Sequence, residues 1–260
     1  MAIYSVYDHF SEIAPVYRDL RTTDLQPVRH IVKHLRGVSR ISVADVGCGA
    51  GRYDLMLFQH LGRKTDHFYC VDTTQGMLEQ VRDYLTRHCI RGFEIVRSAA
   101  RNLPLRAEHL NCMFTFNAVH HFDVSRFLNE ASRVLVRKGY LFIYTRFRSQ
   151  NRQSIWGRYF PHFCEKETRL FESDELEQMI STTPRLRMED VKFFRYQRAS
   201  SLGKLLELAR HRHYSTFSQY SKSELSACLV RFEKNIRDSF EDLDNVRWTD
   251  QNVMLTIRKD

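Results

Sequence analysis

Val43-Ala-Asp-Val-Gly-Cys-Gly-Ala-Gly51 decides the fold, because an apolar run ends there in three closely spaced glycines. The segment that follows, Arg52–Leu61, has apolar residues three or four positions apart, which predicts a helix. Glycines at such a junction let the chain turn tightly and let a ligand approach the backbone, while helix amides point into the site. The stretch therefore predicts a strand, a glycine-rich turn and a helix that together form a ligand site.

Two carboxylates flank this turn and restrict the ligand. The glycine spacing, with Arg52 directly after the third glycine, does not meet the dinucleotide pattern G-x-G-x-x-G. Asp45 precedes the first glycine by two residues, where its charge would repel a pyrophosphate, and Asp72 ends the next strand, where a carboxylate commonly holds ribose hydroxyls. The pair suits S-adenosylmethionine, which carries an ammonium, a sulfonium and a ribose diol. The alternative, that each acid only caps a helix, is less favoured.

Short apolar runs alternate with helical stretches over residues 41–144, a pattern typical of a parallel sheet covered on both faces. Two later strands bring the expected number to seven. We therefore expect an α/β fold with a Rossmann-like, mostly parallel seven-stranded sheet, helices on both faces and a helical lid insertion. The expected strands are Ile41–Val46, His67–Val71, Phe93–Val96, Cys112–Asn117, Tyr140–Tyr144, Val191–Tyr196 and Val253–Ile257, and the helices between the first five are Arg52–Leu61, Thr74–His88 and Asp123–Val136.

Further helices are expected before and after this pattern. Residues 5–20 and 25–36 have apolar residues at helical spacing, and Gly37 closes the second of these helices. Ser173, followed by two acids, begins a helix that runs to about residue 180. A capping box, Ser221-x-x-Glu224, opens the clearest helix of a late insertion.

These elements suggest a division of the chain. We expect residues 1–199 to form the Rossmann-like core with its N-terminal helices, residues 200–246 a helical insertion, and residues 247–260 the last strand of the core. The insertion is either a lid over the ligand crevice or an added packing element without ligand contact.

Composition sets limits on the class of protein. The 260 residues are 43% hydrophobic and 27% charged, as in ordinary globular proteins, and the net charge of +9 lies mostly in residues 131–260. The six cysteines have no paired spacing, which indicates a reducing compartment without a disulfide framework. The first 20 residues lack a signal-peptide pattern, and no apolar run is long enough to cross a membrane. We expect a soluble, cytoplasmic protein with no membrane association, present as a monomer or homodimer.

Residues 41–144 resemble class I S-adenosylmethionine-dependent methyltransferases, in the broad group that includes ubiquinone/menaquinone-type methyltransferases. The resemblance implies this fold and this cofactor, with S-adenosylhomocysteine as the product, and says little about the methyl acceptor. Five ordered motifs carry it: Asp45-Val-Gly-Cys-Gly-Ala-Gly51, Val71-Asp-Thr-Thr-Gln-Gly-Met-Leu78, Arg101-Asn-Leu-Pro-Leu105, Asn117-Ala-Val-His-His-Phe122 and Arg133-Val-Leu-Val-Arg-Lys-Gly139.

The resemblance implies cofactor roles for the residues around the glycine turn. The methionine part of the cofactor would lie against Gly47, Gly49 and Gly51. Asp45 would engage its ammonium, directly or through water, and Asp72 would accept hydrogen bonds from the ribose hydroxyls.

Other positions follow from the remaining motifs of the resemblance. Thr73 and Met77 would flank the adenine, and Asn117 would lie near the methionine moiety or sulfonium, chiefly through its backbone. The opening stretch of the chain resembles the first helix of these enzymes, which often folds over the cofactor. Tyr17 and Arg21 are therefore candidates for closing that side.

One position departs from the pattern. Where the family often has an acid that contacts the adenine amino group, this chain has Ser98-Ala99-Ala100, and Ala99 cannot accept that hydrogen bond. Backbone groups around Ala99 and Ala100, or the nearby Arg101 and Asn102, would hold the adenine instead. The loss of one hydrogen bond weakens binding by about 1 kcal/mol.

Methyl transfer from a sulfonium is an in-line displacement that needs no protein nucleophile, and a general base only if the acceptor must lose a proton. His120 and His121, directly after the fourth expected strand, are the candidates for that base, and a purely structural role for them is equally favoured. His211 and His213 have no third ligand close by in sequence, so we expect a surface position for them and no metal site.

The acceptor is left open between three classes. Arginines interleaved with aromatic residues follow the fifth expected strand and suit an anionic small molecule, RNA phosphates and bases, or simply a solvated surface over a packed core. A small-molecule acceptor is favoured because no RNA-binding module is appended. An RNA or tRNA methyltransferase and a non-catalytic S-adenosylmethionine-binding protein are the alternatives. The residues concerned are Arg146, Arg148, Arg152 and Arg158 with Phe147, Trp156, Tyr159 and Phe160.

Overall fold

The computed structural model describes residues 6–14, 17, 18 and 20–260, and the chain divides into two compact units. The unit that we call the sheet unit comprises Thr22–Thr145, Ser173–Lys192 and Val253–Asp260. The other, the helical unit, comprises Met1–Arg21, Arg146–Glu172 and Phe193–Asn252. These boundaries cut the chain differently from the segments 1–199, 200–246 and 247–260 that the sequence suggested, because residues 146–172 group with the late insertion.

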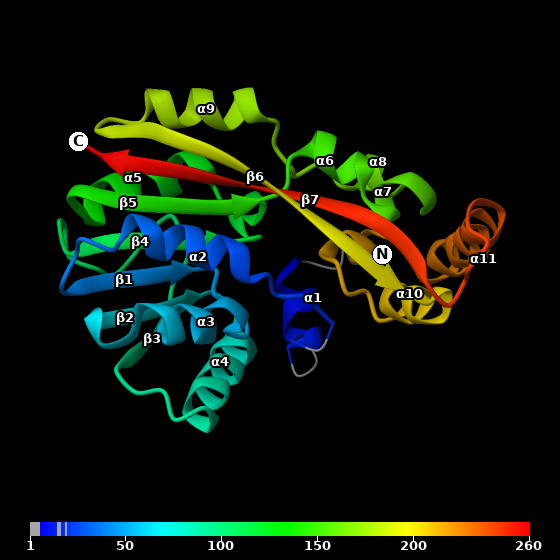
Figure 1. Cartoon of the computed structure of the whole chain (residues 1–260), viewed down its shortest axis with the longest axis horizontal. Helices are drawn as coiled ribbons and strands as arrows, with labels where there is room; N and C mark the ends of the chain where they lie inside the picture. The colour runs from blue at the N-terminus through cyan, green and yellow to red at the C-terminus, as the bar shows by residue number, and fades with distance from the viewer. Residues whose placement is uncertain (1–5, 15–16, 19) are drawn as a thin grey trace. The chain divides into compact units, whose positions relative to one another are not determined.

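A seven-stranded sheet with strand order β3-β2-β1-β4-β5-β7-β6 forms the centre of the sheet unit (Figure 1). The first five strands of this order pair in parallel, and β7 runs antiparallel to β5. The expected mostly parallel seven-stranded sheet is therefore confirmed. The strands are β1 (Ile41–Val46), β2 (Thr65–Asp72), β3 (Phe93–Arg97), β4 (Leu110–Phe116), β5 (Leu135–Thr145), β6 (Leu186–Ser200) and β7 (Val246–Lys259).

Helices lie on both sides of this sheet, which explains why its central strands are apolar without alternation. All but one residue of β4 is buried, as in a strand covered on both faces. Helix α2 packs against α3 and α3 against α4, while α5 packs against α9 and β5. The helical elements of this unit are α2 (Leu25–His34), α3 (Arg52–Leu61), η1 (Gly62–Lys64), α4 (Gln75–Arg87), η2 (Val119–His121), α5 (Val124–Val134) and α9 (Ser173–Thr182).

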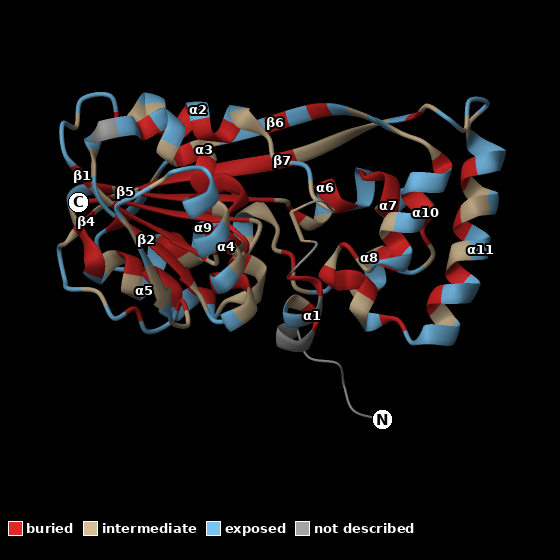
Figure 2. Cartoon of the chain, turned by 90° about the horizontal axis from the view of Figure 1, so that it is seen from below, coloured by how far each residue is buried: buried red, intermediate tan, exposed pale blue. Residues whose placement is uncertain are grey.

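The helical unit has its own core, built largely from aromatic side chains. Trp156 and Phe232 stack with ring centroids 5.3 Å apart, and Phe217 meets Trp156 edge-on at the same separation. Red, buried positions line the facing sides of its helices in Figure 2. Its helices are α1 (Val6–Ile13), α6 (Arg148–Gln153), α7 (Ile155–Tyr159), α8 (Phe163–Lys166), α10 (Leu202–Arg210), η3 (Ser215–Gln219) and α11 (Lys222–Ser239).

Local signals placed several helices correctly. The predicted capping box is present, since the Ser221 hydroxyl accepts from the Glu224 amide at 3.1 Å and the Glu224 carboxylate accepts from the Ser221 amide at 3.3 Å. The prediction that Gly37 closes the second helix is wrong. That helix ends at His34, because the Leu35 amide donates to the Ile31 carbonyl and Leu35 then leaves the helical conformation. The helix expected over residues 5–20 is helical at Val6–Ile13, and residues 5, 15, 16 and 19 lie outside the described part.

The last two strands are much longer than their apolar runs suggested. Strand β6 has 15 residues and β7 has 14, and each begins or ends in the helical unit. Most of β6 is exposed or half-exposed, and many of its positions are charged or polar, so its full length does not form an apolar run. Strand β5 also starts earlier than expected, at Leu135, which pairs with Leu110. A bulge that carries Arg137 and Lys138 outside the regular pairing separates this start from the apolar run. Among the described residues, no helix is long and apolar enough to cross a membrane.

Candidate active site

The glycine turn joins β1 to α3 at the carboxyl edge of the sheet. Gly47, Gly49 and Gly51 all have positive φ angles, of 76°, 54° and 80°, a conformation that side chains with a Cβ rarely adopt. The amides of Gly47 and Cys48 donate to the Val71 carbonyl at 2.8 and 3.1 Å, which ties the turn to β2. The backbone at this turn therefore depends on glycine, as the sequence predicted.

Close packing adds a second reason for two of these glycines. A Cβ at Gly47 would lie 2.6 Å from the Cβ of Ala118, and a Cβ at Gly51 would lie 2.5 Å from Cγ2 of Val81 on α4. Both separations are shorter than real Cβ contacts. The turn is thus held between the segment after β4 and the helix after β2.

Asp72, at the end of β2, is hydrogen-bonded to the backbone of the glycine turn. Its Oδ2 accepts from the Gly49 amide at 3.0 Å and its Oδ1 accepts from the Thr74 amide at 2.8 Å. Burial raises the pKa of the Asp72 carboxyl, while the two amide hydrogen bonds act in the opposite direction. The structure therefore brings Asp72 and the glycine turn into direct contact.

Asp45 faces a second buried acid, Asp54, which the sequence analysis missed. Asp45 is 2% exposed and Asp54 is fully buried, and the two carboxyl groups lie within hydrogen-bonding reach of each other. Burial raises the pKa of Asp45 well above its usual range and that of Asp54 to about 7. Two neighbouring buried carboxyl groups cannot both carry a charge cheaply, so the raised pKa values favour a protonated carboxyl in this pair.

This burial bears on the role expected for Asp45. With the side chain covered, contact with a cofactor ammonium, directly or through water, stays a prediction. Asp54 was missed because an acid in the first turn of a helix ordinarily interacts with the helix dipole at the surface. Its position between Tyr53 and Leu55, both buried residues, is the one signal that could have found it.

The expected adenine positions lie in the segments that follow β2 and β3 and on α4. Thr73 is exposed, whereas Met77 is 1% exposed and packs in the core, so Met77 would need to be uncovered before it could touch a ligand. The Ser98 amide donates to the Asp72 carbonyl at 3.0 Å, which holds the half-exposed Ala99 next to the end of β2. Ala100 is buried.

Asn117 and the two candidate histidines follow β4. Asn117 has a positive φ of 53°, and its amide donates to the Tyr144 carbonyl at 2.7 Å. His120 and His121 lie in the short helix η2, half-exposed, with ring centroids 4.1 Å apart. A catalytic role for either histidine stays a prediction.

Tyr17 and Arg21 belong to the helical unit. The Arg21 guanidinium lies over the Tyr17 ring, 5.4 Å from its centroid, and over the Tyr214 ring at 4.1 Å. Their contacts within that unit are therefore with each other and with the late insertion. Their part in closing over a cofactor stays a prediction.

Several side chains of the late basic segment have structural partners. Arg146 pairs with Asp250 at 3.3 Å, and Arg148 donates to the Leu170 carbonyl at 2.9 Å, while Trp156 is buried in the aromatic core.

The surface position expected for His213 is wrong. This ring is 4% exposed and bonds to the Leu208 carbonyl at 3.0 Å, and burial lowers its pKa well below the usual value. Among the described residues, no three His, Cys, Asp or Glu side chains are placed to hold a metal ion.

A comparison with protein families matches residues 44–143 to the model described as a methyltransferase domain. Residues 44–143 are a methyltransferase domain. The match spans β1 to β5 and includes the glycine turn, Asp72 and the segment after β4. The resemblance to class I methyltransferases is thereby confirmed.

Relatives of known name differ in what they modify. The chain is 41% identical over 155 residues to a phthiotriol/phenolphthiotriol dimycocerosates methyltransferase of Mycobacterium ulcerans, covering 56% of this chain and 54% of that protein. It is 29% identical over 143 residues to a bovine (Bos taurus) protein named probable tRNA methyltransferase 9B, covering 54% of this chain and 28% of that protein. The chain thus spans little more than half of the first relative and about a quarter of the second.

The solved structures that resemble this one share its fold. One is a geranyl diphosphate methyltransferase in complex with GPP and sinefungin, with a TM-score of 0.56 and 16% identity over 90% of this chain and 76% of that one. At this identity the likeness concerns the fold alone.

Proposed function

We propose that the protein is an S-adenosylmethionine-dependent methyltransferase that transfers the methyl group in line to a small-molecule, anionic acceptor. The observation that carries the proposal is the contact between Asp72 and the glycine turn within a methyltransferase domain. A ligand that carries a ribose and positive charge fits this turn, because no lysine or arginine side chain is present between Val46 and Gly51 to meet a phosphate.

The groups around Asp72 fit the ribose of such a cofactor. Each carboxylate oxygen has two lone-pair positions, so Asp72 can hold the Gly49 and Thr74 amides and still accept from two ribose hydroxyls. The exposed Thr73 and the half-exposed Ala99 would border the adenine. When bound, the cofactor supplies an electrophilic methyl group, and the residues at the edge of the sheet orient it and exclude water.

His120 or His121 would serve as a general base if the acceptor must lose a proton. Their half-exposed position after β4 supports this role, since a base must be reachable by the acceptor. Sinefungin, bound in the solved geranyl diphosphate methyltransferase, is an analogue of S-adenosylmethionine and supports the choice of cofactor.

Replacement of Asp72 by Asn tests the cofactor site. We expect the affinity for S-adenosylmethionine to fall about 100-fold, because two hydrogen bonds to a charged acceptor are weakened, each by roughly 1.5 kcal/mol. Asn keeps one oxygen for a backbone amide, so the fold should persist, which circular dichroism and urea unfolding would check. Isothermal titration calorimetry measures the affinity, with the exposed Asp83→Asn on α4 as the matched control. An unchanged affinity in Asp72→Asn would show that the ribose lies elsewhere.

A tRNA acceptor is the second candidate, because curated relatives named probable tRNA methyltransferase 9B match the chain. If RNA is the acceptor, filter retention of unmodified tRNA should fall steeply with salt, as expected for contacts with several phosphates. On our proposal, tRNA is not retained specifically at low salt, and no labelled methyl group from S-adenosylmethionine enters it. Methyl incorporation into tRNA would replace the small-molecule acceptor by RNA.

A further inference from the structure

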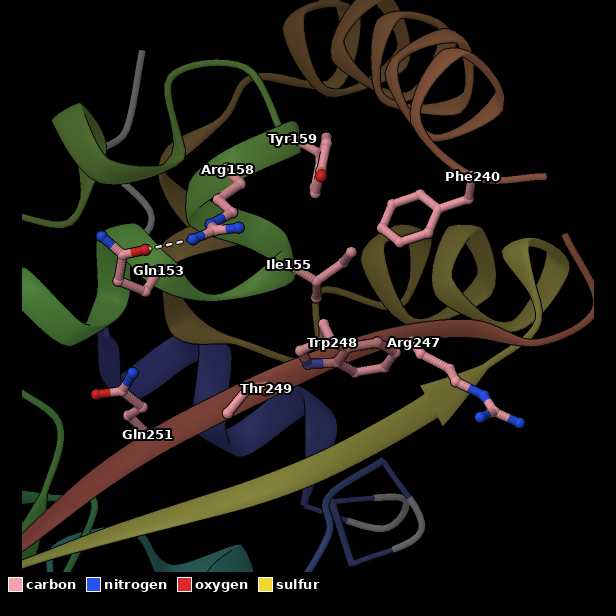
Figure 3. A pocket seen from close by; sticks show the side chains of 9 residues that line it. All are labelled: Gln153, Ile155, Arg158, Tyr159, Phe240, Arg247, Trp248, Thr249 and Gln251. Carbon is pink, nitrogen blue, oxygen red and sulfur yellow. Dashed lines mark hydrogen bonds between the residues drawn. The ribbon is translucent and has the colours of Figure 1, made fainter. Parts of the chain in front are cut away.

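The helical unit contains a pocket of about 310 Å³ that the cofactor site does not use (Figure 3). One wall is the first part of β7, and the other comes from α7 and from Phe240 just after α11. Its volume lies at the small end of the range for ligand pockets, which suits a molecule with one or two rings. The lining residues are Gln153, Ile155, Arg158, Tyr159, Phe240, Arg247, Trp248, Thr249 and Gln251.

Two arginines line this pocket, and neither is balanced by a carboxylate. Arg158 donates to the neutral Gln153 side-chain oxygen at 2.5 Å, while Figure 3 shows the Arg247 guanidinium turned away from the other lining side chains. Within the described part of the chain, neither guanidinium has an acid within 4 Å. Asp250, three residues after Arg247, is engaged by Arg146 and Arg198, and Asp244, three residues before it, is exposed. The pocket therefore carries positive charge that is available to a ligand.

Aromatic side chains give the pocket an apolar body. The rings of Tyr159 and Phe240 meet edge-on with centroids 5.4 Å apart, and Figure 3 shows them on the same side of the pocket, with Ile155 between them and Trp248. The Trp248 indole nitrogen is buried and has no hydrogen-bond partner in the described structure. A buried donor of this kind costs free energy until an acceptor meets it.

We propose that this pocket binds a small organic anion, a carboxylate or phosphate ester attached to a flat apolar body. The anionic group would be held by Arg158, the body would pack against Tyr159 and Phe240, and an acceptor atom would meet the Trp248 indole N–H. Binding needs no cofactor, so this inference goes beyond the proposed function and does not depend on it.

The probe for this site is 1-anilinonaphthalene-8-sulfonate, an aromatic anion whose fluorescence rises when it enters an apolar site. Arg158→Gln should weaken its binding about fivefold to tenfold, because it removes the charge-assisted contact, whereas Arg247→Gln should have little effect because that guanidinium points away. Trp248→Phe keeps an aromatic ring and removes the N–H, and should weaken binding about threefold. Arg231→Gln, an exposed arginine on α11 outside the pocket, is the matched control and should leave the affinity unchanged.

Two further binding measurements define the chemistry of the ligand. The uncharged N-phenyl-1-naphthylamine should bind more weakly and should not respond to the arginine substitutions. Competition by 4-hydroxybenzoate and by phenyl phosphate then distinguishes a carboxylate from a phosphate, with phenol as the neutral control. Asp72→Asn should leave probe binding unchanged, so failure of the cofactor proposal stays separate from failure of this one. Equal affinity for the charged and uncharged probes, or probe binding that neither Arg158→Gln nor Trp248→Phe weakens, would overturn the proposal.

Discussion

Replacement of Gly51 by Ala is expected to destabilise the protein by about 3 kcal/mol and to abolish cofactor binding. The residue has φ of 80°, where a Cβ costs about 1–2 kcal/mol, and that Cβ would overlap Cγ2 of Val81 at 2.5 Å, which adds about 1–3 kcal/mol. The backbone of the turn would have to move away from α4, taking with it the Gly49 amide that bonds to Asp72. Urea unfolding measures the loss of stability, and calorimetry with S-adenosylmethionine measures the loss of binding.

Gly92→Ala separates the two causes. Gly92 has almost the same φ, 79°, but nothing lies within 4 Å of the position that its Cβ would take. Its replacement should therefore cost only the conformational part, about 1 kcal/mol, and should leave cofactor affinity intact. Equal destabilisation by the two substitutions would contradict the packing of the turn against Val81.

Asp54→Asn is expected to remove part of the fall in stability that the wild type shows as pH rises. The pKa of Asp54 is raised from 3.8 to about 7, so between these values the folded protein holds a proton that the unfolded chain has released. Stability therefore falls as pH rises from about 4 to about 7, by up to about 4 kcal/mol. Asn carries no titrating proton, so the part of this fall that comes from Asp54 should be absent in the variant, while the raised pKa of Asp45 keeps its own part.

The charges around this pair come from three elements, and all bear on the experiment. Asp72 at the end of β2 raises the pKa of both acids, and Arg52 on α3 lowers that of Asp45. Asp45 on β1 and the Cys70 thiol on β2 lower the pKa of Asp54. The measurement is the difference in unfolding free energy between the wild type and Asp54→Asn at a series of pH values. Asp83→Asn, at an exposed position on α4, controls for loss of a negative charge. A constant difference from pH 4 to pH 8 would show that the pKa of Asp54 is not raised in the folded protein.

The sequence predicted the elements around the glycine turn most closely, for a physical reason. Strand β1 and helix α3 were predicted with the bounds that the structure shows, since the glycines fix where one ends and the other begins. Strands β6 and β7 were found only in part. The halves of β6 and β7 that lie in the helical unit carry polar residues, and these halves are stabilised by pairing of the two strands with each other. Such pairing between distant segments does not require an apolar run in the sequence.

The site was predictable where residue type alone carries the chemistry. Asp72 and the glycines stand in a recognisable order, and their contact follows from the meeting of strand ends at one edge of a parallel sheet. Asp54 was not predictable in the same way, because its proximity to Asp45 depends on the orientation that α3 takes after the glycine turn. Nor could the sequence place Arg158 and Trp248 in one pocket, since they come from segments far apart in the chain.

The measurement that tests the central claim most directly is a calorimetric titration of the purified protein with S-adenosylmethionine, S-adenosylhomocysteine and NAD⁺. We expect the first two to bind with dissociation constants in the micromolar range, about −8 kcal/mol, because the turn receives a ribose at Asp72 and has no group for a phosphate. NAD⁺, which carries a pyrophosphate, should give no binding heat. Tight binding of NAD⁺, or no binding of either sulfur nucleoside, would contradict the assignment of this site.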